Sequence, residues 1–187
     1  MMGEQAVPAP RAFEREDELA SALVACDARA WRQLFEEQYD RVYAYAYVRT
    51  GNTADADDIA SITFTEAVKS IRRFDYRGTP VAAWLFRIAH HETVDLLKRR
   101  KRMQTDALDE ADGRQARGED AIVQAGQRRD IAEAMTQLND DQRAVVVLRL
   151  VEGCSVAEAA VTLGKSEGAV KVTQMRALRK LRRVIEG

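Results

Sequence analysis

Apolar residues recur at helical spacing along most of the chain, and no stretch shows the alternation of a strand. One helical pattern begins near residue 17, and a second covers about 31–47 and ends at Gly51–Asn52. A third runs from Thr53 to Ile71, and a fourth starts at Thr79–Pro80 and reaches about Arg102. Four helices with short connections predict an all-α bundle of roughly 85 residues.

Periodicity stops between residues 103 and 127, where six acids stand against two bases, a net charge of −4. A stretch of this length without periodicity is uncommon inside a compact domain and predicts a flexible acidic linker between two domains. Residues 1–12 also lack periodicity and predict a disordered tail. The predicted organisation is therefore a first domain at 13–102 and a second, smaller helical domain at 128–187.

The second domain has clear helix boundaries. A helix is predicted at about 128–138, and Asn139 opens another that ends at Gly153. Ser155 and Glu158 have the spacing of a capping box, which starts a short helix. After the turn at 164–166, a longer basic helix follows, and this succession predicts a helix-turn-helix. Packing of the two helices without DNA binding stays open as an alternative.

Two basic helix ends are candidates for nucleic-acid contact. In a helix-turn-helix the start of the second helix enters the major groove, and Lys171, Gln174, Met175 and Arg176 share one face there. The helix that starts at Thr79 ends in the basic run 98–102 and follows the aromatic loop 74–78. This arrangement suits a polyanion, although a solvated Lys/Arg tail would have the same sequence.

Several classes of function lack a motif in this sequence. His90 and His91 are the only histidines and are adjacent, while Cys26 and Cys154 are far apart, so no metal site or disulfide framework is predicted. Phosphate-loop, dinucleotide and nucleophile motifs are absent. We therefore expect no enzymatic activity and no cofactor. No apolar run could span a bilayer and no signal peptide is recognisable, so a cytoplasmic, nucleoid-associated protein without membrane insertion is expected.

Three segments, in their order and spacing, resemble the extracytoplasmic-function (ECF) sigma factors, group 4 of the sigma-70 superfamily. DADDIASITF at 55–64 resembles region 2.2, WLFRIAHHETVDLLKRR at 84–100 resembles regions 2.3 and 2.4, and 138–181 resembles region 4. The resemblance implies an alternative sigma factor that binds core RNA polymerase, recognises the −35 and −10 promoter elements and assists −10 melting. It also implies contacts with the β′ clamp helices and β flap of the polymerase, and an anti-sigma factor as a further partner.

The same resemblance assigns residues to these roles. It implies contact with core polymerase by Asp57, Asp58, Ile59, Ser61 and Ile62. It implies −10 DNA binding by Phe74, Asp75, Tyr76, Arg77, Trp84, His91, Asp95, Lys98, Arg99 and Arg102, with a base flipped into the loop at 74–79. It implies −35 DNA binding by Ser166, Lys171, Val172, Gln174, Met175, Arg176 and Arg179.

The chain departs from the family at two of these places. Ser61–Ile62 stands where Gln-Glu is usual, and His91 stands where Asn is usual, so no promoter consensus is carried over. Two other functions stay open at this point. One is a stand-alone helix-turn-helix regulator whose first domain senses a ligand or dimerises, and the other is a sigma-like adaptor that titrates a partner protein.

Overall fold

The computed structural model describes residues 13, 15–74, 76, 79–107 and 134–185, and these residues contain helices and no strand. The N-terminal domain consists of α1 (Glu16–Val24), α2 (Ala28–Thr50), α3 (Thr53–Ser70), the short 3₁₀ helix η1 (Ile71–Arg73) and α4 (Val81–Ala107). The C-terminal domain contains α6 (Asp140–Val146), the π-helical η2 (Val147–Val151), α7 (Val156–Leu163) and α8 (Glu167–Ile185). The predicted all-α, two-domain architecture is confirmed, while the predicted tail and most of the predicted linker lie outside the described residues.

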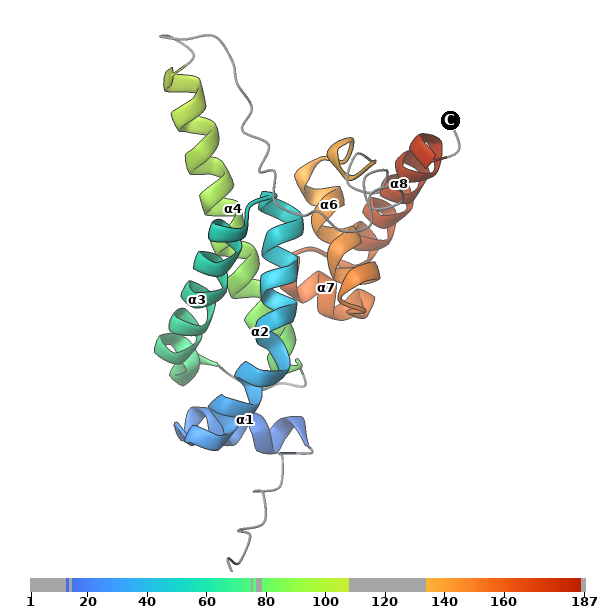
Figure 1. Cartoon of the computed structure of the whole chain (residues 1–187). Coiled ribbons are helices and arrows are strands. Elements are labelled where there is room, and N and C mark those ends of the chain that lie inside the picture. Colours follow the sequence, from blue (N-terminus) through green and yellow to red (C-terminus); the bar gives the residue numbers. More distant parts are fainter. Residues whose placement is uncertain (1–12, 14, 75, 77–78, 108–133, 186–187) are drawn as a thin grey trace, which may run out of the picture.

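Helices α2, α3 and α4 run side by side, and α1 crosses one end of them (Figure 1). The C-terminal turns of α4 extend past the other helices (Figure 1). α4 has 27 residues, which corresponds to a length of about 40 Å. The C-terminal domain lies against the side formed by α2 and α4, with α7 next to α4.

The local signals at Gly51, Gly164 and Ser155 mark helix ends correctly, whereas α4 begins at Val81 and not at the predicted Thr79–Pro80. Gly51 ends α2 with a φ of 66°, and Gly164 ends α7 with a φ of 61°, a left-handed conformation in which a side chain would be strained. The capping box of Ser155 and Glu158 is present in full at the start of α7. At the start of α4, the Val81 amide donates to the Glu16 carboxylate at 3.0 Å, so α1 is tied to the beginning of α4.

The end of α6 differs from the prediction. The sequence predicts one regular helix up to Gly153, but the backbone widens into η2, where the Glu152 amide donates to the Val147 carbonyl at 2.9 Å. Leu150 and Val151 are consequently more than half exposed rather than part of an apolar face. The wider turn also directs Glu152 toward α2, where it contacts Arg41. Periodicity does not predict such a π segment.

One of the buried apolar clusters among the described residues passes through both domains. Buried residues of α2 and α4, such as Val42 and Phe86, belong to the same cluster as Leu148, Ala159 and Val170 of the C-terminal domain. The two domains therefore pack directly on each other in this conformation. The sequence predicts two separate ordered parts and contains no signal for this contact.

Candidate nucleic-acid interface

One face of α4 carries the predicted −10 residues at helical spacing. The positions are Trp84, His91, Asp95, Lys98 and Arg102, which are seven, four, three and four residues apart. His91, Lys98 and Arg102 are exposed, as is the neighbouring Arg99, while Trp84 and Asp95 are half-buried. An elongated, mostly basic strip therefore follows α4 toward its projecting end.

Aromatic side chains meet where this strip begins. The rings of Phe74 and Trp84 lie with their centroids 4.8 Å apart, and the Tyr76 side chain is exposed nearby in sequence. The predicted loop residues Asp75 and Arg77 lie outside the described residues. Because every nucleobase has a π face, the half-buried Phe74–Trp84 pair and the exposed Tyr76, at one end of a helix face that also carries exposed cations, suit a single strand whose bases are unstacked.

The two adjacent histidines have opposite environments. His91 is exposed, and its Nδ1 lies 3.7 Å from Oδ2 of Asp95, one turn further along. His90 points inward, where its Nδ1 lies 2.8 Å from the hydroxyl of Tyr45. Arg49 in turn donates to the Tyr45 oxygen at 3.0 Å. The sequence cannot separate these two roles by residue type, because only the position on the helix decides which ring faces the core.

Burial keeps His90 and Tyr45 uncharged, so that Arg49 is the only charged member of this hydrogen-bonded group of three. Burial and the nearby Arg49 charge lower the pKa of His90 to about 4. Burial raises the pKa of Tyr45 to about 12, so its hydroxyl keeps its proton. At neutral pH the Tyr45 hydroxyl therefore donates to an uncharged His90, and this chain of hydrogen bonds fixes α2 against α4.

One cation of the basic run is used inside the domain. Arg100 donates to Oδ1 of Asp55 at 2.7 Å, and the Asp55 side chain is only 13% exposed. This pair ties α4 to the first turn of α3. The sequence pattern predicts that the whole run 98–102 binds a polyanion. Arg100 instead pairs with Asp55 and holds α4 in place.

The outer face of α3 carries four of the five residues predicted to bind polymerase. Asp57, Asp58, Ser61 and Ile62 are exposed. Ile59 is 2% exposed and packs in a cluster with Ala46 and Ala56, so its side chain supports α3 from inside and does not face a partner. Only the family resemblance implies a polymerase contact by Ile59, and the fold buries this side chain.

Near the α2–α3 contact, the structure exposes an aromatic residue of the second predicted helix. Phe35 is 45% exposed, and its ring centroid lies 4.8 Å from that of Tyr39 and 4.9 Å from that of Phe64. An exposed aromatic ring that rests on a half-buried and a buried aromatic neighbour is typical of a protein contact surface.

The helix-turn-helix prediction is confirmed in its geometry. Ser166 caps α8 by accepting from the Ala169 amide at 3.2 Å, and Val170 is fully buried against α7. The opposite face of α8 exposes Lys171, Val172, Met175, Arg176 and Arg179. Gln174 is half-buried, and its side-chain oxygen accepts from Nε of Arg149 at 3.3 Å.

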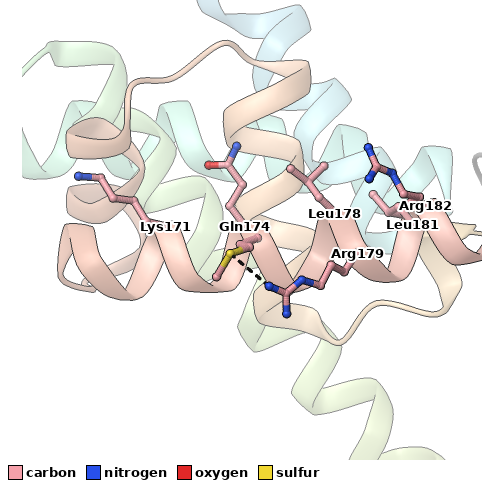
Figure 2. Close-up of a pocket in the computed structure, with 7 residues that line it drawn as sticks. Lys171, Gln174, Leu178, Arg179, Leu181 and Arg182 are labelled. Atoms are coloured by element: carbon pink, nitrogen blue, oxygen red, sulfur yellow. Dashed lines mark hydrogen bonds between the residues drawn. The ribbon is translucent and has the colours of Figure 1, made fainter.

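A groove follows this exposed face of α8. It is lined by Lys171, Gln174, Met175, Leu178, Arg179, Leu181 and Arg182 (Figure 2). Nη2 of Arg179 lies 3.6 Å from the sulfur of Met175, and Leu178 is 40% exposed (Figure 2). Leu178, Leu181 and Arg182 are absent from the predicted set, although the helical spacing carries the signal: Leu178 follows Gln174 by four residues, Leu181 by seven, and Arg182 follows Arg179 by three.

Other kinds of site find no support in the described part of the chain. Its His, Cys, Asp and Glu side chains form no group of three that could hold a metal ion. Of the helices described, none has the length and apolar content needed to cross a bilayer. The described thiols, Cys26 on the surface and Cys154 in the interior, are both free.

The fold and surface define a class: a helical protein with a helix-turn-helix in one domain and an aromatic, basic helix face in the other. Family models agree with this class. The model for Sigma-70 region 2 matches residues 34–103, and the model for Sigma-70, region 4 matches residues 128–181.

Similar proteins extend the match to nearly the whole chain. The ECF RNA polymerase sigma factor BldN of Streptomyces coelicolor is 36% identical over 171 residues, which cover 90% of this chain and 65% of that protein. SigD of Mycobacterium tuberculosis (strain H37Rv), also an ECF RNA polymerase sigma factor, is 31% identical over 176 residues, which cover 90% of this chain and 83% of that protein. The solved structure of CnrH in complex with the cytosolic domain of CnrY is 26% identical, with a TM-score of 0.69 over 91% of this chain and 97% of that chain.

The chain therefore belongs to the ECF family of RNA polymerase sigma factors, within the sigma-70 superfamily.

Proposed function

We propose that this protein acts as an alternative sigma factor: it binds core RNA polymerase, recognises a −35 and a −10 promoter element and assists melting at −10. One observation carries the proposal. A single chain holds a helix-turn-helix with a basic exposed face on α8 and a second domain whose α4 carries an aromatic and basic strip. The protein contributes binding, and the polymerase contributes the chemistry.

The strip on α4 suits the melted non-template strand of the −10 element. Extrusion of a base costs a few kcal/mol, which contacts in a pocket must offset. The Phe74–Trp84 pair supplies a stacking surface, and exposed cations at Lys98, Arg99 and Arg102 supply phosphate contacts. Asp75, Tyr76 and Arg77 complete the proposed loop contacts. His91 and Asp95, both accessible on the strip, are proposed to read bases.

The exposed face of α8 suits the major groove of the −35 element. Lys171, Gln174 and Arg176 provide hydrogen-bonding groups for base edges. Val172 and Met175 are exposed apolar side chains that fit thymine methyl groups. Ser166 and Arg179 lie at the two ends of this set and are proposed to contact phosphates, which fix register without carrying sequence information.

The outer face of α3 is the proposed contact for the β′ clamp helices. Asp57, Asp58, Ser61 and Ile62 present two carboxylates, a hydroxyl and an apolar side chain to solvent. Ile59 holds this face in place from the core. The C-terminal domain is proposed to contact the β flap, and the sequence departure at Ser61–Ile62 predicts a clamp contact with fewer charged pairs than is usual in the family.

An anti-sigma factor is proposed as a further partner. CnrH, which matches this chain along almost its entire length, was solved in complex with the cytosolic domain of CnrY. In this chain the groove on α8 has an apolar floor at Met175, Leu178 and Leu181 with cations at its edges. Such a surface suits an amphipathic, acidic segment of a partner as well as it suits DNA.

The stand-alone regulator is not favoured, because the Sigma-70 region 2 model covers the domain that would have to sense a ligand or dimerise. The adaptor alternative differs from a sigma factor because an adaptor binds its partner protein without any contact with DNA.

Reconstitution tests the proposed function. The purified chain is run with core polymerase on a size-exclusion column, and transcription is measured on genomic templates with transcript start sites mapped. Co-elution and new, promoter-specific transcripts are expected. Asp57→Ala with Asp58→Ala should weaken co-elution, whereas Glu36→Ala with Glu37→Ala, two exposed acids on α2, serves as the charge-matched control. If the chain neither co-elutes nor gives a specific transcript, the sigma factor proposal is wrong.

A further inference from the structure

The first turn of α8 carries an acid that the predicted −35 set does not include. Glu167 is the first residue of α8, and its side chain is 56% exposed. No other acid lies in the described length of this helix, whose exposed face is otherwise basic and apolar. In a helix-turn-helix, the N-terminal residues of the second helix contact base edges. Phosphates repel a carboxylate at such a place, so it favours DNA binding only if a base donates a hydrogen bond to it.

Glu167 forms an ion pair with Lys171, one helical turn further along α8. Oε2 of Glu167 lies 3.9 Å from Nζ of Lys171. The two side chains are 56% and 64% exposed, so both remain accessible to a partner. A carboxylate only accepts hydrogen bonds and an ammonium group only donates them. The pair therefore presents an acceptor directly beside a donor.

The other polar groups of this face offer few acceptors. Its lysine and arginine side chains have none. The side-chain oxygen of Gln174 already accepts from Nε of Arg149 at 3.3 Å, and the Ser166 hydroxyl accepts from the Ala169 amide at 3.2 Å. Glu167 therefore supplies the charged acceptor of the described face, and the bases that it can select are those that donate.

Gly168, the next residue, leaves a gap in the same face. It lies one turn before Val172 and two turns before Met175, both exposed. A Cβ at this position would lie in open space, and the backbone is helical, so neither packing nor a positive φ requires glycine here. Glycine costs stability in a helix because it loses more conformational freedom than alanine on folding. The missing side chain therefore indicates a partner that approaches the backbone closely.

We propose that Glu167 and Lys171 together read one C·G base pair of the −35 element, and that Gly168 leaves the space in which this base pair approaches the helix. The inference rests on the proposed function. It adds to that function a specificity-determining residue, Glu167, and the base that this residue selects.

The major-groove edge of a C·G pair matches the ion pair. Cytosine N4 is a donor there, and guanine O6 and N7 are acceptors. Glu167 accepts from the cytosine while Lys171 donates to the guanine of the same pair. An A·T pair also places a donor beside an acceptor, but adenine N7, a second acceptor next to that donor, repels the carboxylate.

Selection from a promoter library tests the base preference. The full-length chain, assembled with core polymerase, selects fragments with a randomised −35 element, and the selected fragments are sequenced. The wild type should favour C·G at one position about tenfold over other pairs. Glu167→Ala should lose this preference at that position alone. Its affinity for duplex of unrelated sequence should stay equal or rise, because a negative charge is removed.

Glu167→Gln gives a second, different outcome. A glutamine amide both donates and accepts, and it pairs with N6 and N7 of adenine. The preference at the same position should therefore change from C·G to A·T. A side chain with a purely structural role would not exchange one base for another. Glu66→Gln is the matched control, because it removes an exposed ion pair with Lys69 inside α3 and should leave every base preference unchanged.

Gly168→Ala tests the gap. Because the new methyl group lies in open space in the free protein, the melting temperature should rise by about 2 °C. Affinity for the selected promoter should nevertheless fall about tenfold, as expected when one base-pair contact is lost. Ala169→Gly, the exposed neighbour, should lower the melting temperature and leave the affinity within about twofold of the wild type. A Gly168→Ala variant that binds as tightly as the wild type would overturn the role of the glycine.

The library is also offered to the free chain, so that base reading is measured with and without polymerase. If no wild-type selection favours a C·G pair, or if Glu167→Ala selects the same sequences as the wild type, the inference is wrong. Specific transcription in that case leaves the sigma function standing. If the free chain selects the pair through Glu167 but does not assemble with polymerase, the proposed function is wrong and the base reading is retained.

Discussion

α4 and α8 both carry predicted DNA-binding residues and basic ends, but the two helices are embedded in different ways. On α4, Leu85, Phe86 and Ala89 are fully buried and lie within one or two turns of the strip that begins at Trp84. On α8, Val170 and Ala177 are the fully buried apolar positions, and nearly all the other described residues of the helix are exposed or half-buried. The proposed reading surface of α4 therefore shares its turns with several large core side chains, while that of α8 shares its turns only with the smaller Val170 and Ala177.

The comparison teaches how each surface tolerates change. A substitution in the first half of α4 affects folding and DNA contact together, because the same turns contact α2, α3 and α7. A substitution on the exposed face of α8 can change DNA contact alone. If the two faces bind DNA as proposed, sequence preference at −35 is easier to alter without loss of stability than preference at −10.

The largest effect is expected from Phe86→Ala. The Phe86 ring is fully buried, packs edge-on against Tyr45 at 5.8 Å and lies under Arg41. Its truncation should lower the free energy of unfolding by about 3–5 kcal/mol. Leu178→Ala, at a 40% exposed position of α8, should cost well under half of that. Urea unfolding of both variants measures the difference, and equal costs would contradict the contrast between the helices.

The opposite pattern is expected for Lys171→Ala combined with Arg176→Ala. Both side chains are exposed on α8, so the melting temperature should stay near that of the wild type. Transcription that depends on the −35 element should be lost, and the salt dependence of duplex binding should fall by about two units of slope if both cations contact phosphate or base edges.

Its control is Lys69→Ala, an exposed cation on α3 away from the reading face. Filter binding across a salt series and in vitro transcription supply the two readouts. If the double variant still transcribes from −35-dependent promoters at the wild-type level, α8 does not read the −35 element. If the double variant loses transcription but still binds a protein partner, transcription depends on DNA contact by α8, which is expected of a sigma factor and not of an adaptor.

The sequence predicts the helices and their ends well because those features depend on neighbouring residues. Gly51, Gly164 and the pair Ser155–Glu158 act within one turn of the chain, and the structure has each of them in the predicted role. The failures involve partners distant in sequence. Arg100 is bound by Asp55 and Glu152 by Arg41, and no local pattern identifies either partner.

The candidate site follows the same rule. Trp84, His91, Asp95, Lys98 and Arg102 share a face of α4 as helical spacing requires. Ile59 was expected to contact polymerase because the family resemblance implies it, whereas the fold buries this side chain against α2. The difference between His90 and His91 likewise depends on which helix face meets Tyr45.

A moderate effect is expected when α4 loses its tie to α3. Asp55→Asn removes the charge that holds Arg100 at 2.7 Å, and the Asp55 side chain is only 13% exposed. The free energy of unfolding should fall by about 1–2 kcal/mol, because a hydrogen bond to a charged group is lost in a half-buried site. Asp57 lies two residues further along α3 and is exposed, so Asp57→Asn should change the free energy of unfolding by no more than about 0.5 kcal/mol.

Chemical denaturation at low and high salt checks this prediction. The gap between the two variants should persist at high salt, because screening acts weakly on a partly buried pair. A gap that disappears at 1 M salt would show that Asp55 and Arg100 interact only as surface charges.

The smallest effect is expected from acid, through His90. The folded state holds the pKa of His90 at about 4, mainly through burial, with Arg49 and Lys165 also opposing protonation and Asp141 favouring it. In the unfolded chain an imidazole titrates near its ordinary value of about 6.5. Between these two values the unfolded state binds more protons, so this group reduces stability as the pH falls below about 6.5 and has no effect above neutrality.

His90→Gln isolates this contribution. The glutamine can still accept from the Tyr45 hydroxyl but cannot be protonated, so the variant should lose about 1 kcal/mol less than the wild type when the pH drops from 7.5 to 5.5. Glu152, whose pKa burial raises, titrates alike in both chains and cancels from the difference. His91→Gln, at the exposed neighbouring position, should keep the wild-type pH dependence. Urea unfolding at the two pH values gives the comparison, and equal pH dependence in wild type and His90→Gln would mean that the buried face of α4 does not carry the acid sensitivity.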